Sequence, residues 1–191
     1  MESNIMYEYQ TEFTRICRMI ASSTRLAILW LLFEKELCVE EIAAQIGISP
    51  QHASTLLSSM AAKNLLITER HNRKVVYRPS LHGSQNPLLT ALKKEKLRKT
   101  THADIIAQAT AFTHERRIQI ARTLSTVPLT FEELQNRTGM TVPAQTRHLR
   151  KLLRRDVVQE TSEFYSLKKP VTPLAEHLLS MAVRTSNKST G

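Results

Sequence analysis

The sequence predicts a mainly α fold with small β-hairpins, in which a three-helix core plus a hairpin occurs twice and amphipathic helices flank both copies. Three observations lead to this prediction. Gly is scarce, at 4 of 191 residues, and apolar residues recur mostly at helical spacing. The chain resembles itself without gaps at an offset of 92, from about residue 20 to residue 68. Each copy then ends on two short runs typical of strands.

The internal repeat is clearest where residues 24–49 (TRLAILWLLFEKELCVEEIAAQIGIS) lie over residues 116–141 (RRIQIARTLSTVPLTFEELQNRTGMT). Chance can supply a few identical positions, but not the same apolar spacing over about fifty positions. We therefore interpret the chain as two copies of one module. The predicted domains are residues 1–100, with N-terminal and trailing linker helices, and residues 101–191, with a C-terminal helix.

The first copy has the helix-capping and helix-ending residues of a compact helical unit. Residues 24–32 and 39–46 predict two amphipathic helices, and Gly47 ends the second where a left-handed residue is favoured. Ser49 then caps a third helix, predicted over residues 49–62, whose apolar positions recur at three and four residues. A helix, a short turn with Gly and another helix form the helix-turn-helix pattern.

Two short strands follow the third helix. They are predicted around residues 65–67 and 75–77, with residues 70–74 (RHNRK) as the turn between them. A β-hairpin behind a helix-turn-helix is a wing. The second copy has a shortened version over residues 156–169 (DVVQETSEFYSLKK), in which the wing tip is nearly absent.

These residues resemble a winged helix-turn-helix of the ArsR type, a family of bacterial and archaeal transcriptional regulators. The resemblance rests on STRLAIL, ELCVEEIA, SPQHASTLL and VVYR. It covers about residues 15–80 well and residues 107–167 more loosely. It implies sequence-specific binding to double-stranded DNA, with repression relieved by a signal that the sequence does not name. Family members are usually homodimers, so a tandem copy suggests a pseudo-dimeric monomer, with a homodimer as the alternative.

The predicted DNA contacts differ between the two modules. Short neutral side chains on the third helix of the first module can approach base edges, while cations of the wing can grip phosphates. The first-module candidates are Ser49, Gln51, His52, Ser54, Thr55, Ser58, Arg70, Arg73 and Lys74. The second-module candidates, on a more basic helix, are Thr141, Gln145, Arg147, His148, Arg150 and Lys151. The competing interpretation is a solvated polar helix face beside a charged hairpin.

The charge distribution favours an anionic partner. The net charge is +10, with a pI near 9.9. Residues 1–86 hold 9 Lys and Arg against 8 Asp and Glu, whereas residues 87–191 hold 18 against 9. The alternative function is a non-catalytic tandem winged-helix adaptor in a transcription or chromosome-organising complex. The neutral helix of the first module suits such an adaptor, and the strongly basic second half argues against it.

Cysteine usage and hydropathy predict a cytoplasmic protein without a membrane partner. Cys17 and Cys38 are too few for a disulfide framework, which favours a reducing compartment. No apolar run approaches the roughly 18 to 20 residues of a membrane span, and the N-terminus lacks the pattern of a signal peptide.

We also expect no metal, no cofactor and no catalytic residue. In the resemblance, metal-sensing ArsR proteins bind soft metals through a cysteine pair, and Glu40 replaces the second cysteine here. Glu176 and His177 are adjacent and face different directions on a helix. The chain has no Gly-rich phosphate loop, no HExxH-like pair and no nucleophile elbow, so the sequence predicts that the protein is not an enzyme.

Overall fold

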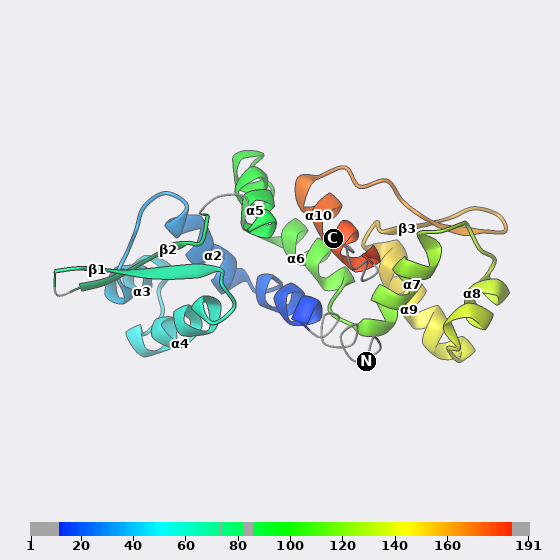
Figure 1. The fold of residues 1–191 in the computed structure, drawn as a ribbon, viewed down its shortest axis with the longest axis horizontal. Helices are drawn as coiled ribbons and strands as arrows, with labels where there is room; N and C mark the ends of the chain where they lie inside the picture. The colour runs from blue at the N-terminus through cyan, green and yellow to red at the C-terminus, as the bar shows by residue number, and fades with distance from the viewer. Residues whose placement is uncertain (1–11, 73, 82–85, 185–191) are drawn as a thin grey trace, which may run out of the picture. The chain divides into compact units, whose positions relative to one another are not determined.

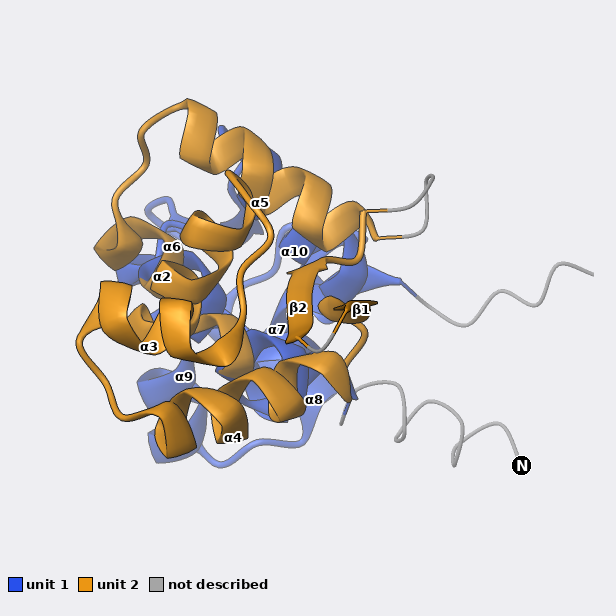
Figure 2. Cartoon of the chain, turned by 90° about the vertical axis from the view of Figure 1, so that its left-hand side faces the viewer, with its two compact units in different colours: residues 1–18, 107–191 blue, residues 19–106 orange. Residues whose placement is uncertain are grey.

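The computed structural model describes residues 12–72, 74–81 and 86–184, and is mainly helical with two small antiparallel sheets (Figure 1). Two compact units divide the chain (Figure 2). Unit 2 is residues 19–106, and unit 1 combines the described parts of residues 1–18 and 107–191. The predicted boundary after residue 100 states which parts of the chain fold as separate domains, and it stays a prediction. Within the described ranges, no helix combines the length and hydropathy needed to cross a membrane.

Three helices form the core of unit 2: α2 (Ser23–Leu32), α3 (Val39–Ile46) and α4 (Pro50–Ala61). Gly47 ends α3 with φ of 71°, a left-handed conformation that residues with a Cβ rarely adopt. The Ser49 hydroxyl then accepts a hydrogen bond from the backbone of α4, so the turn between the two helices is fixed at both ends.

The apolar faces of these helices meet in a continuous core. The largest fully buried side chains of the three helices are Leu26, Ile28, Leu29, Ile42, Leu57 and Met60. All of them except Leu26 are positions that the helical spacing predicts, because one stripe of each helix faces inward, whereas Leu31 and Ile46, also predicted, are only half-buried. A further helix, α5 (Pro87–Leu97), is linked to α2 by Lys96, whose Nζ donates to the Trp30 carbonyl at 2.9 Å and pairs with Glu34.

The wing of unit 2 is an antiparallel pair of β1 (Leu66–His71) and β2 (Lys74–Pro79). The strands pair as far as His71 and Lys74, so the predicted five-residue turn is too long. Asn72 has φ of 57°, which is typical of the tight turns that match strand twist. A β-bridge joins Leu37, before α3, to Tyr77. This bridge ties the hairpin to the helices, and the hairpin extends past them (Figure 1).

Unit 1 has its own three-helix core of α7 (Glu115–Leu124), α8 (Phe131–Thr138) and α9 (Val142–Arg154). Thr130 and Glu133 form a capping box at the start of α8, which satisfies backbone donors that the helix cannot pair internally. As at the end of α3, a left-handed glycine closes α8, and α9 follows at once.

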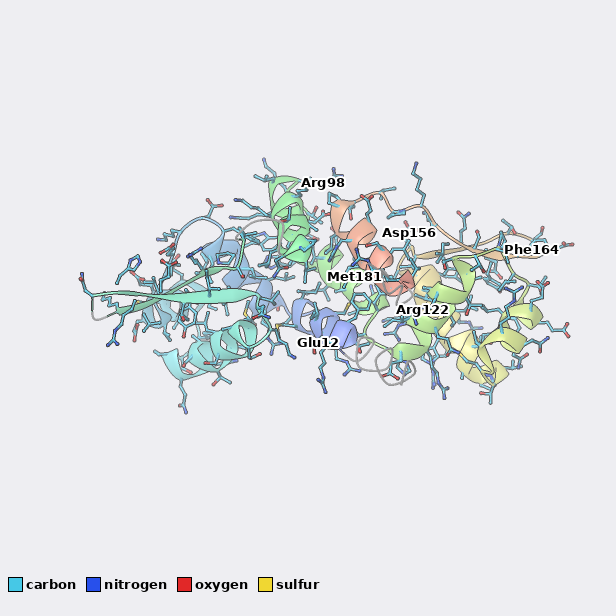
Figure 3. The ribbon with its side chains drawn as sticks, in the orientation of Figure 1. Glu12, Arg98, Arg122, Asp156, Phe164 and Met181 are labelled. Atoms are coloured by element: carbon cyan, nitrogen blue, oxygen red, sulfur yellow. The ribbon has the colours of Figure 1, made fainter. Side chains whose placement is uncertain are left out.

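A short hairpin, two more helices and the helical residues 12–18 also belong to unit 1. The strands β3 (Val158–Glu160) and β4 (Tyr165–Leu167) are antiparallel, and Phe164 is exposed in the loop between them (Figure 3). Helix α10 (Pro173–Val183) packs on α7. Helix α6 (His102–Ala111) spans the boundary between the units, and its second half belongs to unit 1.

Candidate nucleic-acid interface

Helix α4 carries the six neutral candidates of the first module on its solvent side. All six side chains are exposed: Ser49, Gln51, His52, Ser54, Thr55 and Ser58. The opposite side of the same helix is buried through Ala53, Leu56, Leu57 and Met60. The amphipathic pattern therefore places every predicted reader on a face that can approach another molecule, with no Lys or Arg among them.

Two of these polar groups already have partners within the helix. The Ser49 Oγ accepts from the His52 backbone N–H at 3.2 Å, and the Thr55 Oγ1 donates to the Gln51 carbonyl at 3.0 Å. Ser49 therefore keeps its hydroxyl donor and Thr55 keeps an acceptor. In the described part of the chain, the side-chain amide of Gln51 has no hydrogen-bond partner, so it is free to pair with a base edge.

The described cations of the wing differ in exposure and in their partners. Arg70 and Lys74 are exposed, whereas Arg73 lies outside the described residues. Arg78 is half-buried and donates from Nε to Glu69 Oε1 at 2.7 Å, and this guanidinium lowers the pKa of the Glu69 carboxyl. Arg78 therefore holds the hairpin together, and Arg70 and Lys74 are the described wing cations that can contact phosphates.

Sequence reasoning missed a cluster beside the outer half of the wing. Glu36, Glu69 and His71 bring possible ligand atoms within 4.8 Å of one another. Glu36 is far from the hairpin in sequence, and the β-bridge next to it brings it there. The Nε of Arg78 lies 3.6 Å from Glu36 Oε1 and also contacts Glu69, so both carboxylates already pair with a guanidinium.

In unit 1, α9 presents the basic candidates. Arg147 and Arg150 are exposed, Lys151 is half-exposed, and Thr141 is exposed at the N-cap without a side-chain cap hydrogen bond. The pKa of Lys151 is lowered by partial burial and by Arg155 and other cations nearby. Like charges gathered along one helix favour an anionic ligand, because a polyanion relieves their mutual repulsion.

Gln145 was predicted to contact DNA, and this prediction is wrong because its side chain is fully buried. Its Nε2 donates to the Phe131 carbonyl at 2.7 Å, and its Oε1 accepts from Thr138 Oγ1 at 3.3 Å. The amide therefore joins α9 to α8. The register of the internal repeat could have shown this, because position 145 lies over the buried Ala53.

The prediction that His148 contacts DNA is wrong for the same reason, since His148 is only 4% exposed. Its ring lies 4.4 Å, centroid to centroid, from the ring of His114, the N-cap of α7. Both ring nitrogens are buried, and within the described ranges they have no hydrogen-bond partner. Burial, followed by the nearby His114 and by arginines on α7 and α9, lowers the pKa of His148 to about 4. The imidazole is therefore neutral at pH 7 and packs as an apolar group.

Replacing Gln145 by Ala should destabilise unit 1 by about 1 to 3 kcal/mol, because the buried amide is lost and the partly buried Phe131 carbonyl loses its donor. Urea denaturation of the full chain measures this change. Thr146→Ala on the next, half-exposed position is the matched control, for which we expect at most about 0.5 kcal/mol. Equal stability of Gln145→Ala and the parent chain would show that the amide does not hold α8 to α9.

Comparisons with known proteins agree with the geometry of unit 2. Residues 22–66 match the family model described as "Bacterial regulatory protein, arsR family". The chain is 33% identical over 63 residues to the HTH-type transcriptional regulator KmtR of Mycobacterium tuberculosis, covering 33% of this chain and 48% of that protein. The alignment thus spans about half the length of this relative.

A solved structure is also similar, namely human N-acetylserotonin methyltransferase in complex with SAM. The similarity covers 81% of this chain and 47% of that one, with 20% identity and a TM-score of 0.34. This match is to an enzyme, so it overturns our prediction that the protein is not an enzyme, and we withdraw that exclusion. The TM-score is too low to transfer a fold or a reaction to this chain.

The family match begins at the N-cap of α2 and ends at the first residue of β1. It therefore contains α3, the turn at Gly47 and the whole of α4, with all six exposed polar candidates. Residues 22–66 form a helix-turn-helix domain of the ArsR type.

Proposed function

We propose that this protein is a transcriptional regulator that binds double-stranded DNA and reads sequence through α4. The observation that carries the proposal is the solvent face of α4, where six short polar side chains stand within the ArsR-type domain. Such side chains reach base edges closely, and Gln pairs bidentately with adenine. Arg70 and Lys74 of the wing supply positive charge for phosphates beside the groove.

The second half of the proposal is that unit 1 holds another winged helix, so that the chain is a pseudo-dimer. Supporting it, the β-bridge of Leu37 with Tyr77 has a counterpart in the bridge of Leu129 with Tyr165. Leu129 lies exactly one repeat of 92 residues after Leu37. The glycines that end α3 and α8 are also left-handed and separated by the same offset.

The two modules would then make different kinds of contact with one duplex. Helix α4 lacks positive charge and contacts bases, whereas Arg147 and Arg150 on α9 clamp phosphates or read guanine. The proposal also includes a repressor role, a cytoplasmic location and an arrangement in which one chain occupies both half-sites.

Selection of duplexes from a random library, followed by titration of the selected duplex, tests the proposal. Replacing Gln51 and Thr55 by Ala should cost about 1 to 3 kcal/mol of binding per lost base contact, and only on the selected duplex. Replacing Arg70 and Lys74 by Ala should weaken binding to every duplex alike. Gln45→Ala, an exposed Gln on α3, is the matched control and should leave binding unchanged.

The same titrations separate a DNA-binding regulator from an adaptor. A regulator shows a steep linear fall of log affinity with log salt, because bound phosphates release counterions. An adaptor shows little binding at any salt concentration. If Gln51→Ala with Thr55→Ala leaves the sequence preference intact, α4 is not the reader.

A further inference from the structure

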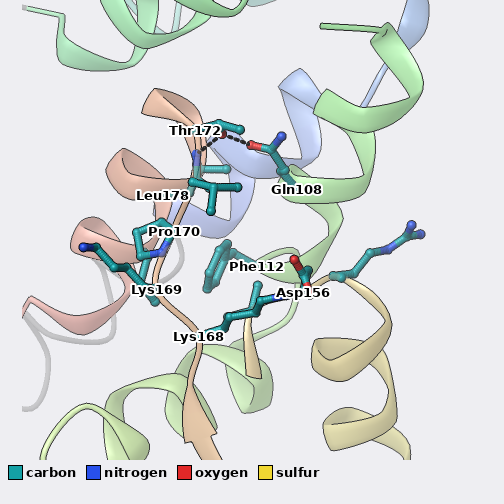
Figure 4. Close-up of a pocket in the computed structure, with 13 residues that line it drawn as sticks. Gln108, Phe112, Asp156, Lys168, Lys169, Pro170, Thr172 and Leu178 are labelled. Carbon is teal, nitrogen blue, oxygen red and sulfur yellow. Dashed lines mark hydrogen bonds and ion pairs between the residues drawn. The ribbon is translucent and has the colours of Figure 1, made fainter. Parts of the chain in front are cut away.

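Unit 1 contains a cavity of about 130 Å³ that lies beside the C-terminal end of α9. Its wall comes from α6, α10, the connection from α9 to β3, and the segment after β4 (Figure 4). Much of that wall is apolar, with Phe112, Val157, Pro170, Ala175 and Leu178 among the lining residues. Such a wall favours an apolar group.

Two polar pairs lie on opposite sides of Phe112 in the view of Figure 4. On one side, Thr172 Oγ1 donates to Gln108 Oε1 at 3.0 Å. On the other, Lys168 Nζ pairs with Asp156 Oδ1 at 2.6 Å. The Lys168 and Asp156 side chains are 41% and 66% exposed, so water screens this pair and a competing anion can replace Asp156 on Lys168 at little cost.

The net charge of the lining residues predicts whether the ligand is an anion or a cation. Arg155, Lys168 and Lys169 contribute three cations, and Asp156 contributes the one carboxylate. With Asp156 engaged by Lys168, the lining keeps a net positive charge. An anion is therefore favoured over a cation, and a carboxylate matches an ammonium as its hydrogen-bond acceptor.

The volume decides the size of the ligand. A cavity of about 150 Å³ holds a benzene molecule, whereas drug-sized ligands occupy pockets of about 300 to 1,000 Å³. A cavity of about 130 Å³ is therefore suited to a single ring or a short branched acyl group, and it excludes a nucleotide.

We propose that this cavity binds a small organic carboxylate, with its ring or branched chain against the apolar wall and its carboxylate on Lys168 in place of Asp156. Asp156 has φ of 60° and is the second residue after α9, and the backbone N–H of Lys168 donates to the Val157 carbonyl at 2.9 Å. Displacing the Asp156 side chain thus acts on the junction that ends α9. The site itself is independent of DNA, and only its effect on DNA binding rests on the proposed function.

Titration of the full chain with benzoate, followed by NMR chemical shifts and calorimetry, tests the site. We expect saturable binding with a Kd of about 1 mM or below, and binding of benzamide at least about fivefold weaker because it lacks the charge. Cyclohexanecarboxylate should also bind, because the wall selects an apolar ring more than aromaticity.

Two variants locate the binding. Ala175→Leu fills the cavity and should weaken benzoate binding at least about tenfold, while Ala103→Leu, at an exposed position of α6, should not change it. Lys168→Gln keeps the fold because its ion pair is exposed, and should weaken binding at least about fivefold, whereas exposed Lys94→Gln should leave it unchanged. Circular dichroism confirms folding of each variant.

The proposal is overturned if neither carboxylate binds at about 20 mM, or if benzoate binds Ala175→Leu and Lys168→Gln as tightly as the parent chain. Adding benzoate to the DNA titration then tests the coupling. Benzoate binding without an effect on duplex affinity keeps the site and removes its regulatory role. Failure of the chain to bind any duplex, with benzoate binding intact, refutes the proposed function and leaves the cavity assignment standing.

Discussion

Replacing Arg117 by Met should lower the free energy of unfolding of unit 1 by about 3 kcal/mol. Arg117 is 9% exposed, and its guanidinium makes three hydrogen bonds around the end of α6. Its Nε donates to the Ala111 carbonyl at 2.7 Å, and its Nη2 donates to the Thr110 carbonyl at 3.0 Å and to Thr113 Oγ1 at 2.8 Å. The last carbonyls of a helix have no partners within its backbone, so Met would remove the guanidinium donor from the Ala111 carbonyl, whereas the Thr110 carbonyl would keep its bond from Thr113 Oγ1 at 3.2 Å.

Urea denaturation of the full chain measures the loss, and Arg116→Met is the matched control. Arg116 is the exposed neighbour on the same helix, so its replacement should change stability by at most about 0.5 kcal/mol. Arg117→Lys should not restore the loss, because an ammonium cannot donate to three acceptors in the planar geometry of a guanidinium. If Arg117→Met and Arg116→Met unfold at the same urea concentration, Arg117 does not hold the end of α6.

Acidification from about pH 7 to about pH 4 should destabilise unit 1 by up to about 3 kcal/mol through His148 alone. The pKa of His148 is about 4 in the folded chain and near 6.5 when the chain is unfolded. Between these values the unfolded state binds more protons, so this contribution is fully present above pH 6.5 and is lost as the pH falls toward 4. His114, Arg116, Arg117 and Arg147 face the imidazole from α7 and α9, and all of them oppose its protonation.

His148→Leu places at this position the residue type that the first module has at Leu56, one repeat earlier. The variant should be as stable as the parent chain or more so at pH 7, and its stability should depend less on pH between about 4 and 6.5. His52→Leu, which makes the same replacement at an exposed histidine of α4, is the matched control. Parallel curves of unfolding free energy against pH for His148→Leu and the parent chain would contradict the assignment.

Local sequence signals predicted most of the helices and their ends. Gly47, Ser49 and the apolar spacing around them act within a few residues, so propensity, capping and periodicity are sufficient to place α3 and α4. The hairpin of unit 2 was also predicted, but with too long a turn, because Asn72 can adopt the left-handed conformation that lets the strands pair further.

The exposure of the candidate site residues was predicted correctly on α4 and only in part on α9. On α4 the helical spacing separated exposed from buried positions correctly, since its buried face is wholly apolar. On α9 the same reasoning placed Gln145 and His148 at the surface, because polar side chains are usually exposed. The structure buries both, since the packing of α9 on α7 and α8 decides which face turns inward, and a buried amide is tolerated when its partners are supplied.

The sequence by itself determined the helical class, the 92-residue repeat, the ArsR-type segment and the basic second half, because these depend on spacing and composition along the chain. Only the tertiary structure decided which cations are free, which polar groups are buried and where a cavity exists. Arg78 pairs with Glu36 and Glu69, and Lys168 with Asp156, because folding brings together side chains that the sequence separates. Such pairings depend on distances across the fold, so local sequence patterns do not predict them.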